Sequence, residues 1–292
     1  MRLVVADLDG TLFPSPLAAK IQHAIRSLRY YRVRFTLATG RTFGGVRELY
    51  ERLSLPAGTP LVLYNGSVVI EGGTGRILHR VTIPAASIEQ VLHRARNYRC
   101  EVFGYSCSYP VEVGSDRLGV IEQVFGCRFG SSRTRRAARD FNRNEINWLS
   151  PTHLSSIPLP SAVLISADDA AMLDALARDL RAIPEVNVTR SGTVYLELRP
   201  AFSNKAAGLA TVASCLDVGA EEVLAIGDHD NDAEMLAWAG IGVVISNASV
   251  VARQNADYVC RRNTFEGVVE VLNIVRQAKR YFPGRTRKTA IA

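Results

Sequence analysis

The strongest constraint on this chain is a short apolar run near its start that ends abruptly in acidic and small polar residues. Residues 3–6 read Leu-Val-Val-Ala, which suits a strand buried on both faces, and residues 7–11 read Asp-Leu-Asp-Gly-Thr. Because side chains alternate along a strand, Asp7 and Asp9 are expected to point the same way. Two adjacent carboxylates are costly to bury unless a cation lies between them. The run therefore indicates either a metal site or a polar turn that follows a core strand.

Two later strands are also expected to end in polar residues. Residues 33–38 form one of them and run into Thr39 and Gly40, while residues 223–226 form the other and run into Gly-Asp-His-Asp-Asn-Asp at 227–232. A hydroxyl and a glycine at a strand end can donate hydrogen bonds to an anion, although a tight turn uses the same residues. In parallel sheets ligands bind outside the carboxyl ends of the strands, so these segments are expected to share one edge.

Lysine is rare in this arginine-rich chain, and its positions are Lys20, Lys205, Lys279 and Lys288. Between Ala201 and Val250 the chain has no arginine, and Lys205 is the only lysine. A lysine ammonium is a compact point charge, whereas an arginine is a planar fork. The choice at position 205 favours a role for a point charge, with chance in a small sample as the alternative.

Together these segments resemble the four motifs of the haloacid dehalogenase superfamily of phosphohydrolases. The long interval before Lys205 resembles the Cof-type branch of that superfamily, in which a large α/β cap is inserted at this place. The resemblance covers nearly the whole chain. It departs at the third motif, because the family often reads Gly-Val-Ser-Lys-Gly where residues 202–206 read Phe-Ser-Asn-Lys-Ala.

The alternation of strands and helices favours an α/β fold with a parallel sheet covered on both faces. The resemblance implies a Rossmann-like, doubly wound core at residues 1–83 and 191–292, with an inserted α/β cap at residues 84–190. Strands are expected at residues 33–38, 61–64, 67–71, 76–80, 100–105, 162–166, 186–189, 194–198, 223–226, 240–246 and 256–260. Helices are expected near residues 15–30, 84–98 and 168–182, and from residues 205 and 263 onward. The strand at 194–198 is expected to return the chain to the core, and the tail from Arg276 to fray.

The resemblance assigns catalytic roles to the first motif. Asp7 would attack phosphorus and form an aspartyl-phosphate, and Asp9 would protonate the leaving oxygen and then activate water. Magnesium would be held by Asp7, the backbone carbonyl of Asp9 and Asp228, with Asp232 as a further ligand or as a residue that orients one. An acidic cluster of this kind suits a hard cation with oxygen ligands.

The same resemblance places Thr39, Gly40 and Lys205 on the phosphoryl group, where they would stabilise its charge. Four residues are candidate substrate contacts. They are Asn65, which follows a strand and precedes a glycine as at the rim of Cof-type sites, Asn231 in the acidic run, and Arg143 and Asn147 in the cap.

Three function classes remain open from the sequence. The leading prediction is a phosphatase acting on a small phosphorylated metabolite, such as a sugar phosphate; a carboxylate at Asp9 favours phosphate esters over carbon–halogen bonds. A phosphosugar mutase of the same superfamily is the second. The third is a basic nucleic-acid-binding protein, suggested by the +7 net charge and the arginines at 133–143, but no aromatic RNA-recognition motif accompanies them.

Composition indicates the class of protein and the cellular compartment. The chain has 292 residues with 47% hydrophobic and 22% charged residues, typical of a globular protein with room for two domains. No apolar run is long enough to span a membrane, and the N-terminus lacks a signal-peptide pattern. The five cysteines are scattered without metal-ligand spacing, which indicates reduced thiols and predicts a cytoplasmic protein. The sequence does not predict the oligomeric state.

Overall fold

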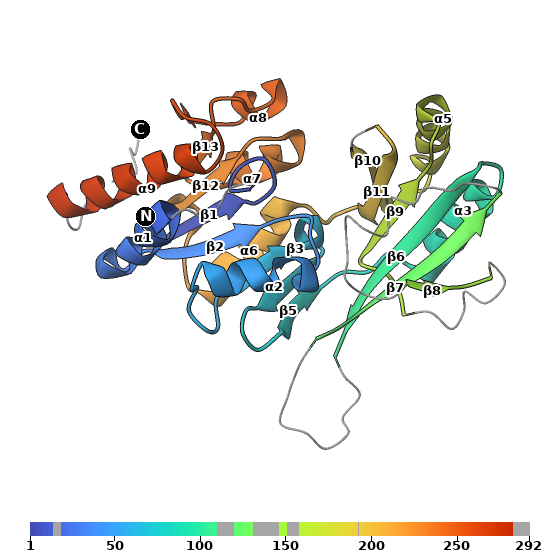
Figure 1. Ribbon diagram of the computed structural model, residues 1–292, viewed down its shortest axis with the longest axis horizontal. Coiled ribbons are helices and arrows are strands. Elements are labelled where there is room, and N and C mark those ends of the chain that lie inside the picture. The colour runs from blue at the N-terminus through green and yellow to red at the C-terminus, as the bar shows by residue number, and fades with distance from the viewer. Residues whose placement is uncertain (14–18, 110–119, 131–145, 151–157, 192, 283–292) are drawn as a thin grey trace, which may run out of the picture. The chain divides into compact units, whose positions relative to one another are not determined.

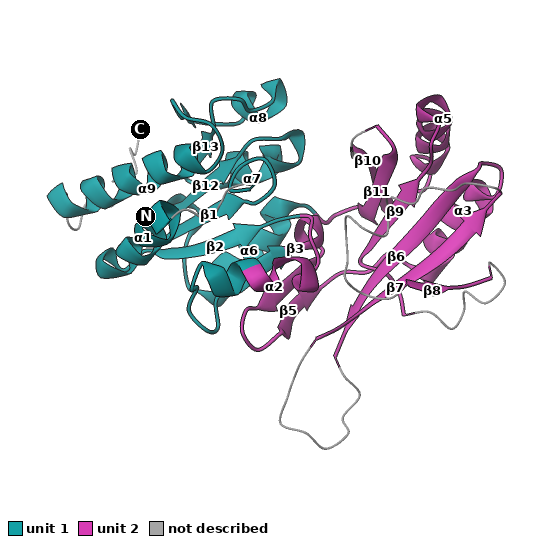
Figure 2. Cartoon of the chain, in the orientation of Figure 1, with its two compact units in different colours: residues 1–39, 49–62, 204–292 teal, residues 40–48, 63–203 magenta. Residues whose placement is uncertain are grey.

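The computed structural model describes residues 1–13, 19–109, 120–130, 146–150, 158–191 and 193–282. Its elements fall into two compact units, which Figure 2 shows in different colours. The first unit comprises residues 1–39, 49–62 and 204–292, and the second comprises residues 40–48 and 63–203. Among the described residues, no helix is both long and apolar enough to cross a membrane.

The first unit is built on parallel strands in the order β14-β13-β12-β1-β2-β3 (Figure 1). The strands are β1 (Leu3–Asp7), β2 (Arg34–Ala38), β3 (Pro60–Leu63), β12 (Val223–Gly227), β13 (Ile241–Val244) and β14 (Tyr258–Val259). β1 lies between β2 and β12, and all five of its residues are buried: the apolar residues 3–6, as the sequence predicts, and Asp7 with them. Asp7 pairs in register with Ala38, and Ala6 with Ile226, so the predicted motifs meet at one edge of the sheet.

Helices cover this sheet, with α1 packed against α9 and α6 packed against α7. They are α1 (Ala19–Leu28), α6 (Lys205–Cys215), α7 (Ala233–Trp238), α8 (Val250–Gln254) and α9 (Thr264–Tyr281). Asn204 caps the helix that begins at Lys205, because its side chain accepts a hydrogen bond of 2.8 Å from the backbone N–H of Ala207.

The second unit contains a six-stranded sheet in the order β10-β11-β9-β6-β7-β8, antiparallel except for the last pair. The strands are β6 (Cys100–Ser108), β7 (Ile121–Phe129), β8 (Ile146–Trp148), β9 (Ala162–Ser166), β10 (Val186–Ser191) and β11 (Tyr195–Pro200). Helices α3 (Ala85–Ala95) and α5 (Ala170–Leu180) bury their apolar faces with this sheet in a core that includes Val91, Ile165 and Leu173. The unit also holds a short turn, η2 (Tyr64–Gly66), and the hairpin of β4 (Val68–Glu71) and β5 (Arg76–Arg80).

The structure differs from the sequence-based expectation in several elements. The strand expected to return the chain to the core at 194–198 is β11, which lies in the six-stranded sheet because it pairs with β9 and β10. Helix α2 (Phe43–Arg52) and strand β7 were not expected. The tail does not fray from Arg276, because α9 continues to Tyr281. The helix start expected at residues 15–16 and the arginines at 133–143 lie outside the described residues.

Candidate active site

The centre of the candidate site is a buried lysine held between two buried aspartates. Lys205 is the first residue of α6, and its Nζ lies 2.5 Å from Oδ1 of Asp7 and 2.6 Å from Oδ1 of Asp232. The side chains of all three residues are at most 5% exposed. Burial opposes a charge on Lys205, but Asp232 and Asp7 outweigh that effect and raise its pKa above the ordinary value. The lysine is therefore a fixed positive charge beside the carboxylate of Asp7.

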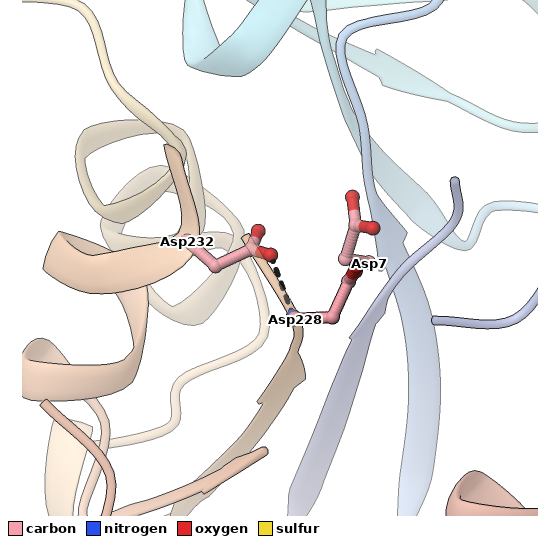
Figure 3. Close-up of side chains that lie close together, drawn as sticks. All are labelled: Asp7, Asp228 and Asp232. Carbon is pink, nitrogen blue, oxygen red and sulfur yellow. Dashed lines mark hydrogen bonds between the residues drawn. The ribbon is translucent and has the colours of Figure 1, made fainter. Parts of the chain in front are cut away.

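A third aspartate completes the cluster (Figure 3). Oxygen atoms of Asp7, Asp228 and Asp232 lie within 4.8 Å of one another. Thr11 donates a hydrogen bond of 2.6 Å to Oδ1 of Asp228 and so fixes this carboxylate from the loop after β1. Gly10 makes the approach possible, because a Cβ at this position would lie 2.3 Å from Oδ2 of Asp228, and its φ of +92° also favours glycine.

The charge of this cluster is out of balance. Three carboxylates face one ammonium, so the fully ionised cluster carries two excess negative charges. Burial raises the pKa of Asp7 well above its ordinary value against the opposing effect of Lys205, and burial also raises the pKa of Asp228 against the hydrogen bond from Thr11. Burial thus disfavours negative charge on both carboxylates. A divalent ion with oxygen ligands fits the donor set and the missing charge.

Asp232 is held differently from the other two aspartates. Its Oδ2 accepts hydrogen bonds from the backbone N–H groups of Asp228 and His229, at 2.9 and 3.1 Å, while its Oδ1 accepts from Lys205. Both oxygens are therefore engaged by protein donors. This arrangement fixes the turn that carries Asp228. Of the two roles left open by the sequence for Asp232, a metal ligand or a residue that orients one, it favours the second.

The remaining predicted residues are distributed around the strand ends. Thr39 is fully buried directly after β2, and its backbone N–H donates to Val62. Gly40 follows Thr39 and, in the second unit, lies against the side chain of Asn65. Asp9 is exposed and is not a member of the carboxylate cluster.

The candidate substrate residues belong to both units, with Asn231 in the first and Asn65 and Asn147 in the second. Asn231 is half-buried in the turn at Asp230–Asp232. Asn147 is exposed on β8 and pairs in register with Phe125, whereas Arg143 lies outside the described residues. Thr11 was missed as a site residue, although its place four residues after Asp7, in the same polar run, was a usable signal.

Comparison with known proteins places this geometry in a family context. Residues 4–272 match the family described as haloacid dehalogenase-like hydrolase. The 5-amino-6-(5-phospho-D-ribitylamino)uracil phosphatase YcsE of Bacillus subtilis (strain 168) is 27% identical over 274 residues, which cover 93% of this chain and 94% of that protein. A haloacid dehalogenase-like hydrolase from Bacteroides thetaiotaomicron has a TM-score of 0.76 and 26% identity, covering 94% of this chain and 99% of that one. The HAD subclass IIB sugar phosphatase BT4131 shares the fold, with a TM-score of 0.70 at 17% identity over 97% of this chain and 99% of that one.

Proposed function

Since the chain belongs to the haloacid dehalogenase-like hydrolases, we propose that it is a magnesium-dependent phosphatase that hydrolyses a small phosphorylated metabolite through Asp7. The observation that carries this proposal is the cluster of three aspartates at the carboxyl ends of β1 and β12, two of which are buried and hold Lys205 between them. It combines a nucleophile, a fixed positive charge and a place for a divalent cation.

The chemistry proceeds in two displacements. An oxygen of Asp7 attacks phosphorus, the bond to the leaving oxygen breaks, and the carboxylic acid of Asp9 gives that oxygen its proton. The Asp9 carboxylate then takes a proton from water as the water attacks phosphorus and releases phosphate from Asp7. Lys205, with the hydroxyl of Thr39 and the backbone N–H of Gly40, stabilises charge on the phosphoryl oxygens in both steps.

The carboxylates of Asp7 and Asp228 and the backbone carbonyl of Asp9 would hold Mg²⁺. The ion, when bound, supplies positive charge to the phosphoryl oxygens. Thr11 and Asp232 support this set from outside, the first by its hydrogen bond to Asp228 and the second by fixing the backbone of the same residue.

The substrate proposed is a phosphate monoester of a polyol or sugar-like metabolite. Two relatives support this class: the name of YcsE describes a phosphoribityl compound, and BT4131 is described as a sugar phosphatase. We further propose that residues 84–190 select the leaving group, because the residues assigned to phosphate chemistry all lie outside this segment.

The test compares wild type with Asp7→Asn, a change that keeps the shape of the side chain and removes the nucleophile. With Mg²⁺ and a panel of sugar phosphates, wild type is expected to release phosphate without an added bisphosphate, and the variant to be slower by orders of magnitude with an unchanged circular dichroism spectrum. Equal rates in the two proteins, or full activity after chelation of Mg²⁺, would refute the mechanism. Activity that requires a sugar bisphosphate would indicate a mutase instead.

A further inference from the structure

The turn at Tyr64–Gly66 has an unusual backbone. Tyr64, Asn65 and Gly66 have successive φ values of +52°, +51° and +97°, so two residues other than glycine lie in the left-handed region. Such a conformation costs about 1–2 kcal/mol for each residue with a side chain. Both side chains are buried, Tyr64 at 1% and Asn65 at 3% exposure. A strained turn persists where its surroundings hold it, and such turns gather at functional sites.

Hydrogen bonds from several segments hold this turn, and all of them lie within the second unit. Oε1 of Glu122, on β7, accepts from the Tyr64 hydroxyl at 2.5 Å, and the two oxygens of the same carboxylate accept from the backbone N–H groups of Phe43 and Gly44 at 2.7 Å. The backbone N–H of Tyr64 donates to the carbonyl of Arg41 at 3.2 Å. The turn is therefore tied directly to the segment that follows Gly40.

Asn65 is the residue of this turn that touches Gly40. A Cβ on Gly40 would lie 2.9 Å from Nδ2 of Asn65 and 3.3 Å from its Oδ1, so the amide lies close to the glycine and leaves no room for a side chain there. Nδ2 donates to Oε1 of Glu197, on β11, at 2.5 Å. A carboxylate only accepts hydrogen bonds, so Glu197 determines which end of the Asn65 amide points toward it.

A second contact joins the same turn to the approach to Lys205. Ser67, directly after Gly66, has its Oγ 2.9 Å from Oγ of Ser203, and Ser203 also donates to the carbonyl of Pro200. Ser203 stands two residues before Lys205 and six after Glu197. The segment from Glu197 to Lys205 is therefore bonded at Ser203 to the residue that follows this turn.

We infer that Glu197 is a positioning residue for phosphate binding: by holding the amide of Asn65 against Gly40, it sets where the backbone of Gly40 lies. Glu197 makes no contact with phosphate in this role. The inference rests on the proposed phosphatase function, which assigns the Gly40 N–H to the phosphoryl oxygens. It predicts a loss that is common to all phosphate esters, because the part of the site affected binds the phosphoryl group and not the leaving group.

The experiment exchanges the polarity of one hydrogen bond. Asn65→Asp places two carboxylates together and is expected to lower kcat/KM about 10- to 100-fold, the range for loss of a hydrogen bond to a charged group. The double variant Asn65→Asp with Glu197→Gln restores a donor opposite an acceptor, and we expect it to recover to within a few-fold of wild type. Inhibition by inorganic phosphate is expected to weaken and recover in parallel. Glu71→Ala, which removes a carboxylate bonded to Arg76 on the neighbouring strand β5 in the same unit, is the control and is expected to match wild type.

The readouts separate this inference from the proposed function. If wild type releases phosphate and the double variant is as impaired as Asn65→Asp, then the pair does not position Gly40 and the inference is wrong. It is also wrong if the variants lose thermal stability while the inhibition constant for phosphate stays at the wild-type value, because the contact is then only structural. If wild type releases no phosphate from any ester, the proposed function itself has failed.

Discussion

Replacement of Lys205 by methionine tests how the buried charges of the candidate site balance. The change keeps the length of the side chain and removes the ammonium that contacts Asp7 at 2.5 Å and Asp232 at 2.6 Å. Removal of one partner from a buried ion pair costs about 3–5 kcal/mol, because the remaining charge stays buried without compensation. Total stabilities are on the order of 5–15 kcal/mol, so the variant is expected to lose a large part of its stability at pH 8.

The pH dependence of this loss follows from the same contacts. Without Lys205, which opposes the effect of burial, the carboxylate of Asp7 is expected to bind a proton more tightly in the folded protein than in the unfolded chain. A carboxyl group whose folded pKa lies above its unfolded value favours folding as the pH falls through the folded pKa. Burial already raises the pKa of Asp7 in the wild type. The difference in stability between wild type and variant is therefore expected to shrink from pH 8 to pH 5.

Urea unfolding followed by circular dichroism at the two pH values measures both effects. Lys20→Met, at an exposed position on α1, is the matched control and is expected to stay within about 0.5 kcal/mol of wild type. A loss below about 1 kcal/mol for Lys205→Met, or a loss independent of pH, would refute the charge balance described here. Saturating Mg²⁺ is expected to stabilise wild type by about 2.7 kcal/mol at one hundred times its Kd.

Three further predictions follow from the site and the thiols. Thr11→Val is expected to weaken Mg²⁺ binding about 10-fold or more, since it releases Asp228; titration calorimetry measures this, and Thr11→Ser is expected to retain affinity. Thr39→Ala is expected to slow all phosphate esters by similar factors, and a reordered substrate preference in steady-state assays would contradict its assignment to the phosphoryl group. In the native protein Ellman's reagent is expected to modify the exposed Cys215 and to spare the four buried cysteines. Burial raises the pKa of three of these four thiols to about 12. The three are Cys100, Cys107 and Cys260. Fast modification of four or five thiols would contradict the described burial.

The sequence predicted the strand ends of the first unit well, because in each motif an apolar run changes abruptly into polar residues, and this change marks the end of the strand. It did not predict α2, where Gly44 and Gly45 weaken the helical signal and where the carboxylate of Glu122 bonds the first N–H groups from 78 and 79 residues away. The sequence also did not predict which sheet contains β11. Its short apolar pattern suits a strand of either sheet, and only its pairing with β9 and β10 determines its place.

The sequence predicted the charged residues of the candidate site but not the contacts that hold Asn65. Asp7, Asp228, Asp232 and Lys205 were recognised as a set before their contacts were known, and the structure brings them together. The pairing of Asn65 with Glu197 spans 132 residues and leaves no periodic trace in the sequence. Contacts of this kind depend on how distant strands pair, which a single sequence does not reveal.

The contact between Ser67 and Ser203 has a consequence for how this protein can change over evolution. The outgoing chain is fixed there because the backbone N–H of Val81 donates to the carbonyl of Ser67, and the returning chain because Ser203 bonds the hydroxyl of Ser67, so both ends of the intervening stretch meet at one residue. A stretch whose ends coincide can be lengthened, shortened or transplanted without moving either junction. Two crossovers at these junctions would therefore exchange the whole stretch, including Glu197. We expect laboratory chimaeras joined at the two serines to keep the contact with the Asn65 amide only where the new stretch supplies a hydrogen-bond acceptor at the position of Glu197.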